Sequence, residues 1–212
     1  MQNTETTLPA IWTVSVTRLS RLMREVTPEF DGRAVIDTLD LGFEEAVSHI
    51  RERLLVDDCD VVLSAGSNGE YLRNRIDKPI VLVRPDGFDL MQALSRARRR
   101  ASKVGIISYG DSLPAFRSFQ QEFGLDIEQR SYAHNEEARD LVAELVARGC
   151  GAIVGSGYVT ELADSVGAVG ILMYSPDSIR RAFEQAIDLA RMLSNARSGV
   201  DRKSTRLNSS HT

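Results

Sequence analysis

The residues with the clearest potential for chemistry follow an apolar run in the first third of the chain. In "CDVVLSAGSNGEYL", residues 59–72, this run ends in small residues at 64–69, and a polar helix-like segment follows. A strand, a turn of small residues and a helix form the usual cradle for a phosphate or carboxylate, because free N–H groups gather at the helix start. The turn contains neither Gly-Lys-Ser/Thr nor G-x-G-x-x-G, the two common nucleotide-binding patterns. Taken alone the signal is weak, and a structural strand-to-helix turn is the simpler interpretation.

A second copy of this pattern lies further along the chain. A shift of 91 residues aligns the two halves without a gap from Cys59 onward, and "GSGYVTEL" then falls on the turn described above. The shift places Cys59 on Cys150, Gly66 on Gly157, Glu70 on Glu161, Pro85 on Pro176 and Asp86 on Asp177. The alignment indicates two similar lobes, and the repetition strengthens the binding interpretation of the turn.

Apolar and helical segments alternate along both halves. The apolar runs lie at 11–16, 34–36, 61–65, 79–83, 104–108, 126–132, 152–154 and 168–174. The helical patterns lie at 17–26, 43–55, 68–76, 88–101, 114–123, 135–148, 158–166 and 176–195. This alternation is typical of an α/β protein with parallel sheets. We expect two lobes of about four parallel strands each, at 9–101 and 102–175, followed by a C-terminal helix at 176–197.

In such lobes a ligand binds outside the carboxyl ends of the strands, and two facing lobes form a cleft there. The loops at that edge are rich in Gly, hydroxyl groups and Arg. Glycine lets the backbone approach a ligand closely, hydroxyl groups donate hydrogen bonds to it, and arginine pairs with its carboxylates. From the first lobe we expect ligand contacts by Ser15, Thr17, Arg18, Gly66, Ser67, Asn68 and Arg84. From the second we expect contacts by Ser108, Tyr109, Arg130, Tyr132, Ser156, Gly157, Tyr174 and Ser175. Together with two helix starts, this set predicts a site for a small polyanion.

An enzyme on the same two-lobe fold, such as a racemase or lyase, is one alternative, and an interaction module that binds no ligand is another. One cysteine on each lobe would suit a racemase, but Cys59 and Cys150 precede their strands. About six residues at about 3.3 Å each would place both thiols some 20 Å from the cleft. No Ser-His-Asp set, paired acids or metal-ligand spacing stands out. We therefore predict no catalytic residues, no metal and no cofactor in this chain.

The composition limits the class of protein. The chain has 212 residues, of which 42% are hydrophobic and 26% charged, and this is typical of a soluble globular protein. No apolar run approaches the roughly 18–20 residues of a membrane helix, and the start shows no signal-peptide pattern. The cytoplasm is the expected compartment. The formal net charge of -4 does not suggest binding to nucleic acid.

The last twelve residues, "DRKSTRLNSSHT", break with everything before them. The first eleven correspond to the translation of a common sequencing-library adapter. We therefore interpret 201–212 as an assembly artefact, and a genuine basic tail is the alternative. Without these residues the net charge becomes -6. On this interpretation the gene continues past residue 200.

Five segments carry a resemblance to a known family. They are "IWTVSVTRL", "LGFEEAVSHIRERL", "CDVVLSAGSNGEYL", "QALSRAR" and "QRSYAHNEEAR". Together they resemble the N-terminal sensor domain of propionate catabolism operon regulators, which are sigma-54-dependent transcriptional activators. The resemblance covers about 9–197.

The resemblance implies more than the residues do by themselves. It implies two three-layer α/β/α lobes with four-stranded parallel sheets, and a final helix that can cross back onto the first lobe. It makes the helices at 88–101 and 176–195 candidates for exchange between lobes. The implied ligand is 2-methylcitrate or a similar polycarboxylate. The implied partners are a following AAA+ ATPase domain of the same chain and, through missing domains only, sigma-54 RNA polymerase and DNA. Neither a membrane partner nor a cofactor is implied, and homo-oligomerisation is left open.

Overall fold

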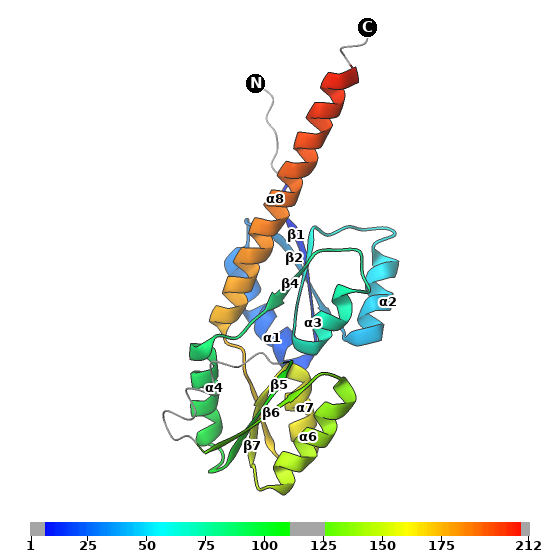
Figure 1. Cartoon of the computed structure of the whole chain (residues 1–212). Helices are drawn as coiled ribbons and strands as arrows, with labels where there is room; N and C mark the ends of the chain where they lie inside the picture. The colour runs from blue at the N-terminus through cyan, green and yellow to red at the C-terminus, as the bar shows by residue number, and fades with distance from the viewer. Residues whose placement is uncertain (1–6, 111–125, 209–212) are drawn as a thin grey trace.

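The computed structural model describes residues 7–110 and 126–208 and divides them between two parallel sheets (Figure 1). The strand order is β2-β1-β3-β4 in the first sheet and β6-β5-β7-β8 in the second. The first sheet consists of β1 (Ala10–Ser15), β2 (Val35–Asp40), β3 (Val61–Ala65) and β4 (Ile80–Val83). The second consists of β5 (Val104–Tyr109), β6 (Ile127–Tyr132), β7 (Ala152–Gly155) and β8 (Val169–Leu172). The two orders are equivalent, so the repeat in the sequence is also a repeat of topology.

The helices follow the strands in the order expected of β/α units. In the first half they are α1 (Thr17–Val26), the short 3-10 helix η1 (Thr27–Phe30), α2 (Phe43–Arg53), α3 (Gly66–Arg73) and α4 (Gly87–Arg98). In the second half they are α6 (Asn135–Ala147), α7 (Gly157–Ser165) and α8 (Pro176–Asn208). The helix expected at 114–123 lies outside the described residues.

Each sheet is covered on both faces, which confirms the three-layer α/β/α class. Along β1, Ile11 packs into one apolar cluster, while Trp12 and Val14 pack into another on the opposite face. Along β5, Ile106 and Ile107 divide in the same way between two clusters. Alternate residues of a strand point to opposite faces, so a parallel strand buried on both reads as a continuous apolar run.

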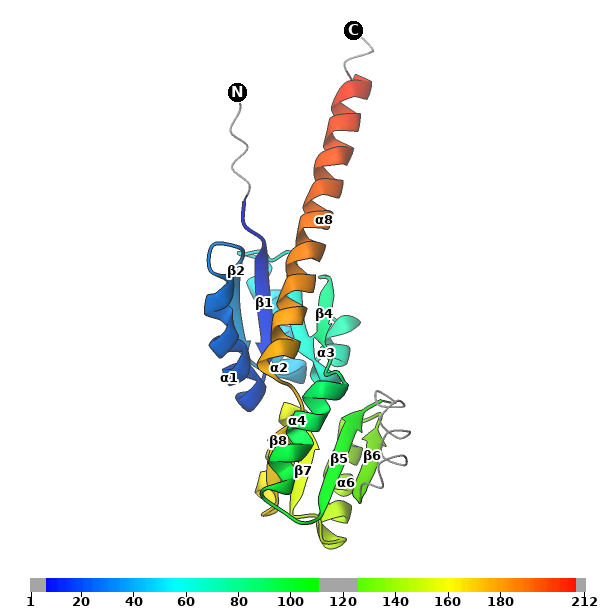
Figure 2. The same ribbon diagram turned by 90° about the vertical axis from the view of Figure 1, so that its left-hand side faces the viewer.

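The last helix of each half packs on the sheet of the other half. Helix α4 contacts β5, β7 and β8, whereas α8 contacts β1, β3 and β4. Figure 2 shows α8 running along the first sheet and α4 lying beside the second. Leu90 of α4 and Phe183 of α8 belong to one apolar cluster that includes residues of both sheets. The sequence-based boundary at 101 groups α4 with the first lobe, whereas its packing groups it with the second.

Helix α8 continues well beyond the first lobe. Among residues 176–197 of this helix, the last buried residue is Ala190, yet the helix runs to Asn208 and projects away from both lobes (Figure 1). The apolar pattern predicts an end near 195, because an apolar periodicity is required only where a helix packs against a sheet. Within the described chain, no helix combines the length and the apolar character that a membrane span requires.

Candidate functional site

The carboxyl ends of the two sheets meet at the junction between the lobes. The hydroxyls of Ser67 in α3 and Tyr132 in β6 are hydrogen-bonded at 3.2 Å across this junction. The rings of Phe43 in α2 and Tyr158 in α7 meet edge to face, with centroids 5.7 Å apart. These contacts connect loops that follow strands of both sheets, which is where parallel α/β sheets place their ligands.

Three helices of the first lobe begin with a backbone in the left-handed region. The first residues of α1, α2 and α3 are Thr17, Phe43 and Gly66, with φ angles of 45°, 51° and 54°. Glycine adopts this region freely, but a side-chain-bearing residue is strained there by an energy of order 1–3 kcal/mol. The N–H of Phe43 donates to Asn68 Oδ1 at 2.7 Å. Asn68 therefore holds a strained helix start in place.

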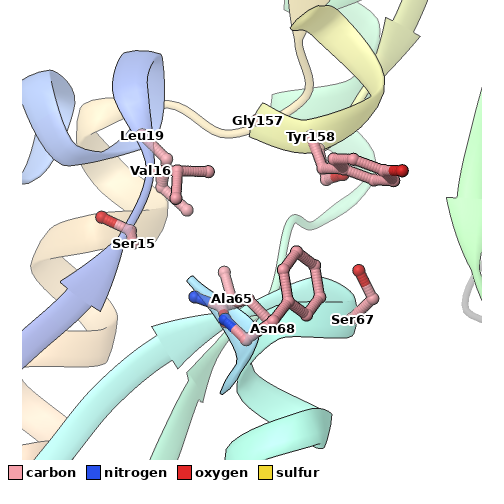
Figure 3. Close-up of a pocket in the computed structure, with 10 residues that line it drawn as sticks. Ser15, Val16, Leu19, Ala65, Ser67, Asn68, Gly157 and Tyr158 are labelled. Carbon is pink, nitrogen blue, oxygen red and sulfur yellow. The ribbon is translucent and has the colours of Figure 1, made fainter. Parts of the chain in front are cut away.

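An inner cavity lies directly between the lobes. It is lined by Ser15, Val16, Leu19, Phe43, Ala65, Ser67, Asn68, Ser156, Gly157 and Tyr158. In Figure 3, Gly157 and Tyr158 of the second lobe lie across this cavity from Ala65, Ser67 and Asn68 of the first. Its free volume is about 20 Å³, and a single water needs about 10–15 Å³ by this measure. The lobes therefore stand closed at this point, with room for a water but not for a tricarboxylate.

Two further hollows open along the same junction. The narrow hollow, of about 90 Å³, is lined by Gly66, Glu70, Leu82, Val83, Arg84, Pro85, Tyr109, Ser156, Met173 and Tyr174. The wide hollow, of about 380 Å³, is lined by Ser67, Glu70, Tyr71, Asn74, Arg75, Tyr109, Ala133, His134, Asn135 and Glu136. Glu70 and Tyr109 line both hollows, so these two residues mark the boundary between them.

Most of the residues expected to contact a ligand come together at this junction. Nine line at least one of the three spaces: Ser15, Gly66, Ser67, Asn68, Arg84, Tyr109, Ser156, Gly157 and Tyr174. A tenth, Tyr132, contacts Ser67 there. Arg18, Thr17, Ser108, Arg130 and Ser175 do not line these spaces. Their assignment to a ligand therefore has no support from the position of their side chains.

The three candidate arginines differ in what they contact. Arg18 donates to Asp164 Oδ2 at 2.5 Å and to the carbonyl of Gly170, so it ties α1 to the second lobe. Arg130 donates to Glu144 Oε1 at 2.8 Å, and this hydrogen bond raises the pKa of the guanidinium. Arg84 makes no hydrogen bond or ion pair with any described residue. Of the three, Arg84 alone has its guanidinium available at the junction.

The other three residues outside the hollows have structural roles. The N–H of Thr17 donates to Asp40 Oδ1 at 3.1 Å. Ser108 is buried within β5. Ser175 donates its hydroxyl to Asp89 Oδ1 at the start of α8. Sequence position alone correctly placed these residues at the carboxyl edge of the sheets, but it did not show whether their side chains point into the junction.

The protonation states favour neutral donors at the junction. Burial raises the pKa of the Tyr132 and Tyr174 phenols, so both remain hydroxyl donors. Burial also raises the pKa of the Cys59 thiol to about 12 and raises that of Cys150. Both thiols are free and buried, and neither lines any of the three spaces described. Among the described residues, no group of His, Cys, Asp and Glu is placed to hold a metal ion.

Several lining residues were not expected from the sequence. Phe43 and Tyr158 lie in the first turns of α2 and α7, and their aromatic character is the only feature of the sequence that could have marked them as lining residues. Glu70 aligns with Glu161 in the repeat, and that repetition is the one signal that could have set it apart from the scattered acids. These three residues thus add apolar surface and a carboxylate to the lining, whereas the residues expected from the sequence were mainly hydroxyl-bearing and cationic.

Comparison with known proteins places this geometry in context. A family model described as propionate catabolism activator matches residues 30–196. A crystal structure of an NtrC family transcriptional regulator from Clostridium acetobutylicum has a TM-score of 0.72 and 22% identity, covering 88% of this chain and 99% of that one. The transcription regulator CcpA of Lactococcus lactis gives a TM-score of 0.45 and 14% identity, covering 88% and 92%. At 22% identity, the first structure shows a shared fold and nothing more. The TM-score of the second is too low to support an argument.

Proposed function

The chain belongs to the propionate catabolism activator family, and from this premise we propose that its two lobes bind a small polycarboxylate between them as the sensor of a transcriptional activator. The observation that carries the proposal is the convergence of donors from both lobes. A Cβ atom on Gly66, at the start of α3, would lie 3.6 Å from Cβ of Ser156, which caps α7. Two helix starts therefore approach each other across the junction, where their partial positive charges favour an anion.

The charged group available for the anion is Arg84. Its exposed guanidinium lines the narrow hollow together with the hydroxyl-bearing Tyr109, Ser156 and Tyr174. An unpaired guanidinium can bind a carboxylate through two parallel hydrogen bonds, and the hydroxyls can donate to further carboxylate oxygens. We assign the first carboxylate of the ligand to Arg84.

The ligand that best fits the family is 2-methylcitrate, a tricarboxylate with one hydroxyl. The closed inner cavity has a volume sufficient for only about one water, so the ligand must part the lobes or enter by the hollows beside it. Binding then shifts the balance between lobe arrangements by the difference in affinity for them. Helix α8 packs on the first lobe and leaves it towards the C-terminus. It would pass the change to an ATPase domain that acts on sigma-54 polymerase.

Calorimetric titration of the chain with 2-methylcitrate tests the proposal. We expect saturable one-site binding, and we expect propionate, which has a single carboxylate, to give none at the same concentrations. Arg84→Gln should weaken binding while leaving the circular dichroism spectrum unchanged. A folded protein that takes up no 2-methylcitrate at millimolar concentration would overturn the proposal.

A further inference from the structure

Glu70 occupies an unusual position for a residue in an anion site. It lies in the second turn of α3, three residues after Ser67 and four after Gly66, so all three share one face of the helix. Helical side chains lean towards the N-terminus of their helix. The carboxylate of Glu70 is therefore directed to the junction between the lobes, where it lines both the narrow and the wide hollow.

The carboxylate retains free capacity as an acceptor. Its side chain is 30% exposed, and its ion pair within the described part of the chain is with Arg73 at 3.4 Å. That distance is long for a charge-assisted hydrogen bond, which usually spans about 2.7–2.9 Å. No described residue donates a hydrogen bond to Glu70. A ligand that offers an O–H or N–H group would meet an unused acceptor here.

The charge around the hollows is less positive than a plain polyanion requires. The lining of the narrow hollow contains one cation, Arg84, and one anion, Glu70. In the wide hollow, Arg75 donates to the Tyr71 carbonyl and stacks over the Tyr71 ring, while Glu136 adds a second carboxylate. A ligand bearing carboxylates alone would be repelled by Glu70 at short range. A ligand that also carries a donor would turn that repulsion into a hydrogen bond.

We propose that Glu70 makes the inter-lobe site selective for carboxylates that also bear a hydroxyl group, which donates to the Glu70 carboxylate while Arg84 holds a carboxylate. This inference rests on the proposed function and adds to it that the site recognises the hydroxyl group of the ligand. A site that hydrogen-bonds a hydroxyl rejects the analogue without it, because the polar group is then left unpaired. The preference expected from one charge-assisted hydrogen bond is about 10- to 100-fold.

A matched pair of ligands isolates this contact. Butane-1,2,3-tricarboxylate is 2-methylcitrate without its hydroxyl, so the ratio of their dissociation constants reports on the hydroxyl alone. In the unmodified protein we expect 2-methylcitrate to bind about 10- to 100-fold more tightly. Glu70→Met has similar length but no acceptor and no charge. It should bring the ratio close to one, weakening 2-methylcitrate and strengthening the analogue.

Two further variants complete the experiment. Glu70→Gln keeps an acceptor oxygen and should retain part of the preference, which guards against a misfolded Met variant. Glu45→Met removes the same charge from an exposed position on α2 and should leave the ratio unchanged. An unchanged ratio in a folded Glu70→Met protein, or preferential binding of an amino dicarboxylate such as glutamate, would overturn the inference alone. Failure of the unmodified protein to bind either tricarboxylate would overturn the proposed function, and this inference with it.

Discussion

The hydroxyls of Ser67 and Tyr132 lie 3.2 Å apart and join the two lobes where the inner cavity meets the wide hollow. Ser67 is 5% exposed and Tyr132 is 2% exposed, so this hydrogen bond is shielded from water. A ligand that enters the junction must pass beside it or replace it. The closed arrangement is therefore stabilised by contacts that lie where the ligand is proposed to bind.

Removing one hydroxyl tests the strength of this connection. Tyr132→Phe keeps the ring but leaves the buried Ser67 hydroxyl without its partner across the junction. We expect a loss of about 1 kcal/mol in the free energy of unfolding, measured by urea denaturation. Tyr174→Phe is the matched control, because the Tyr174 phenol is buried at the same junction and makes no hydrogen bond to a described residue. Equal losses in the two variants would show that the Ser67 contact contributes nothing particular.

Asn68 should matter more to the fold than Ser67 does. Its Oδ1 accepts the N–H of Phe43, whose φ of 51° is strained for a residue with a side chain. Asn68→Ala leaves that N–H unpaired, and we expect a loss of about 1–3 kcal/mol in unfolding free energy. Asn74→Ala, at an exposed position at the end of the same helix, should change stability by less than about 0.5 kcal/mol. A comparably small loss for Asn68→Ala would contradict the role given to this side chain.

The fold was predictable because its signals are local or repeated. Runs such as "VVLSA" in β3 are buried on both faces and are apolar except for Ser64, and the offset of 91 residues relates one lobe to the other. The exchange of α4 and α8 was not predictable from pattern, because an amphipathic helix is compatible with either sheet. Only the resemblance to a family suggested it.

The site was predictable in outline and not in detail. Parallel sheets place ligand loops at their carboxyl ends, and ten of the expected residues do lie at the junction. The direction of a long side chain depends on partners far away in sequence. Arg18 pairs with Asp164, 146 residues later, and Arg130 pairs with Glu144 on the helix that follows its strand. No spacing rule gives such partners, so the number of available cations was overestimated.

Arg84 and Arg130 give a direct comparison of a free and a paired cation. Arg84→Gln should raise the dissociation constant for 2-methylcitrate by about 10- to 100-fold, because a charge-assisted pair is lost. Arg130→Gln removes the same charge from a residue bound to Glu128 and Glu144. It should change affinity less than about twofold, because Arg130 lines none of the three spaces and its guanidinium is already paired with two carboxylates. Calorimetry on both variants shows which arginine binds the ligand. A larger effect at Arg130 would mean that the ligand binds outside the narrow hollow.

The Cys59 thiol should make stability depend on alkaline pH. Burial raises its pKa from 9.0 to about 12, so the folded protein holds this proton more tightly than the unfolded chain does. This contribution is complete below pH 9 and is lost as the pH rises towards 12, by up to about 1.4 kcal/mol per pH unit. Urea denaturation between pH 8 and 10.5 measures the slope. Cys59→Ala should reduce the slope, and identical slopes in both proteins would refute the assignment.

Asp89 holds together the point at which the exchanged helices begin. Its carboxylate is 2% exposed and accepts the N–H of Asp86 at 2.7 Å, the hydroxyl of Ser175, and the guanidinium of Arg181 at 2.8 Å. Asp89 lies in α4, which packs on the second sheet, while Arg181 lies in α8, which packs on the first. The carboxylate thus joins the two crossing segments between the lobes. Any rotation of one lobe against the other must act on this cluster.

Asp89→Ala should therefore lower the unfolding free energy by about 2–3 kcal/mol, because three donors lose their acceptor. Arg181→Met should lower it less, because the Arg181 side chain is 45% exposed and its charge is partly screened by water. The double variant should lose less than the sum of the two single losses, because both remove the same ion pair. Strict additivity in urea denaturation would show that Asp89 and Arg181 act independently, and would contradict a stabilising ion pair between these two residues.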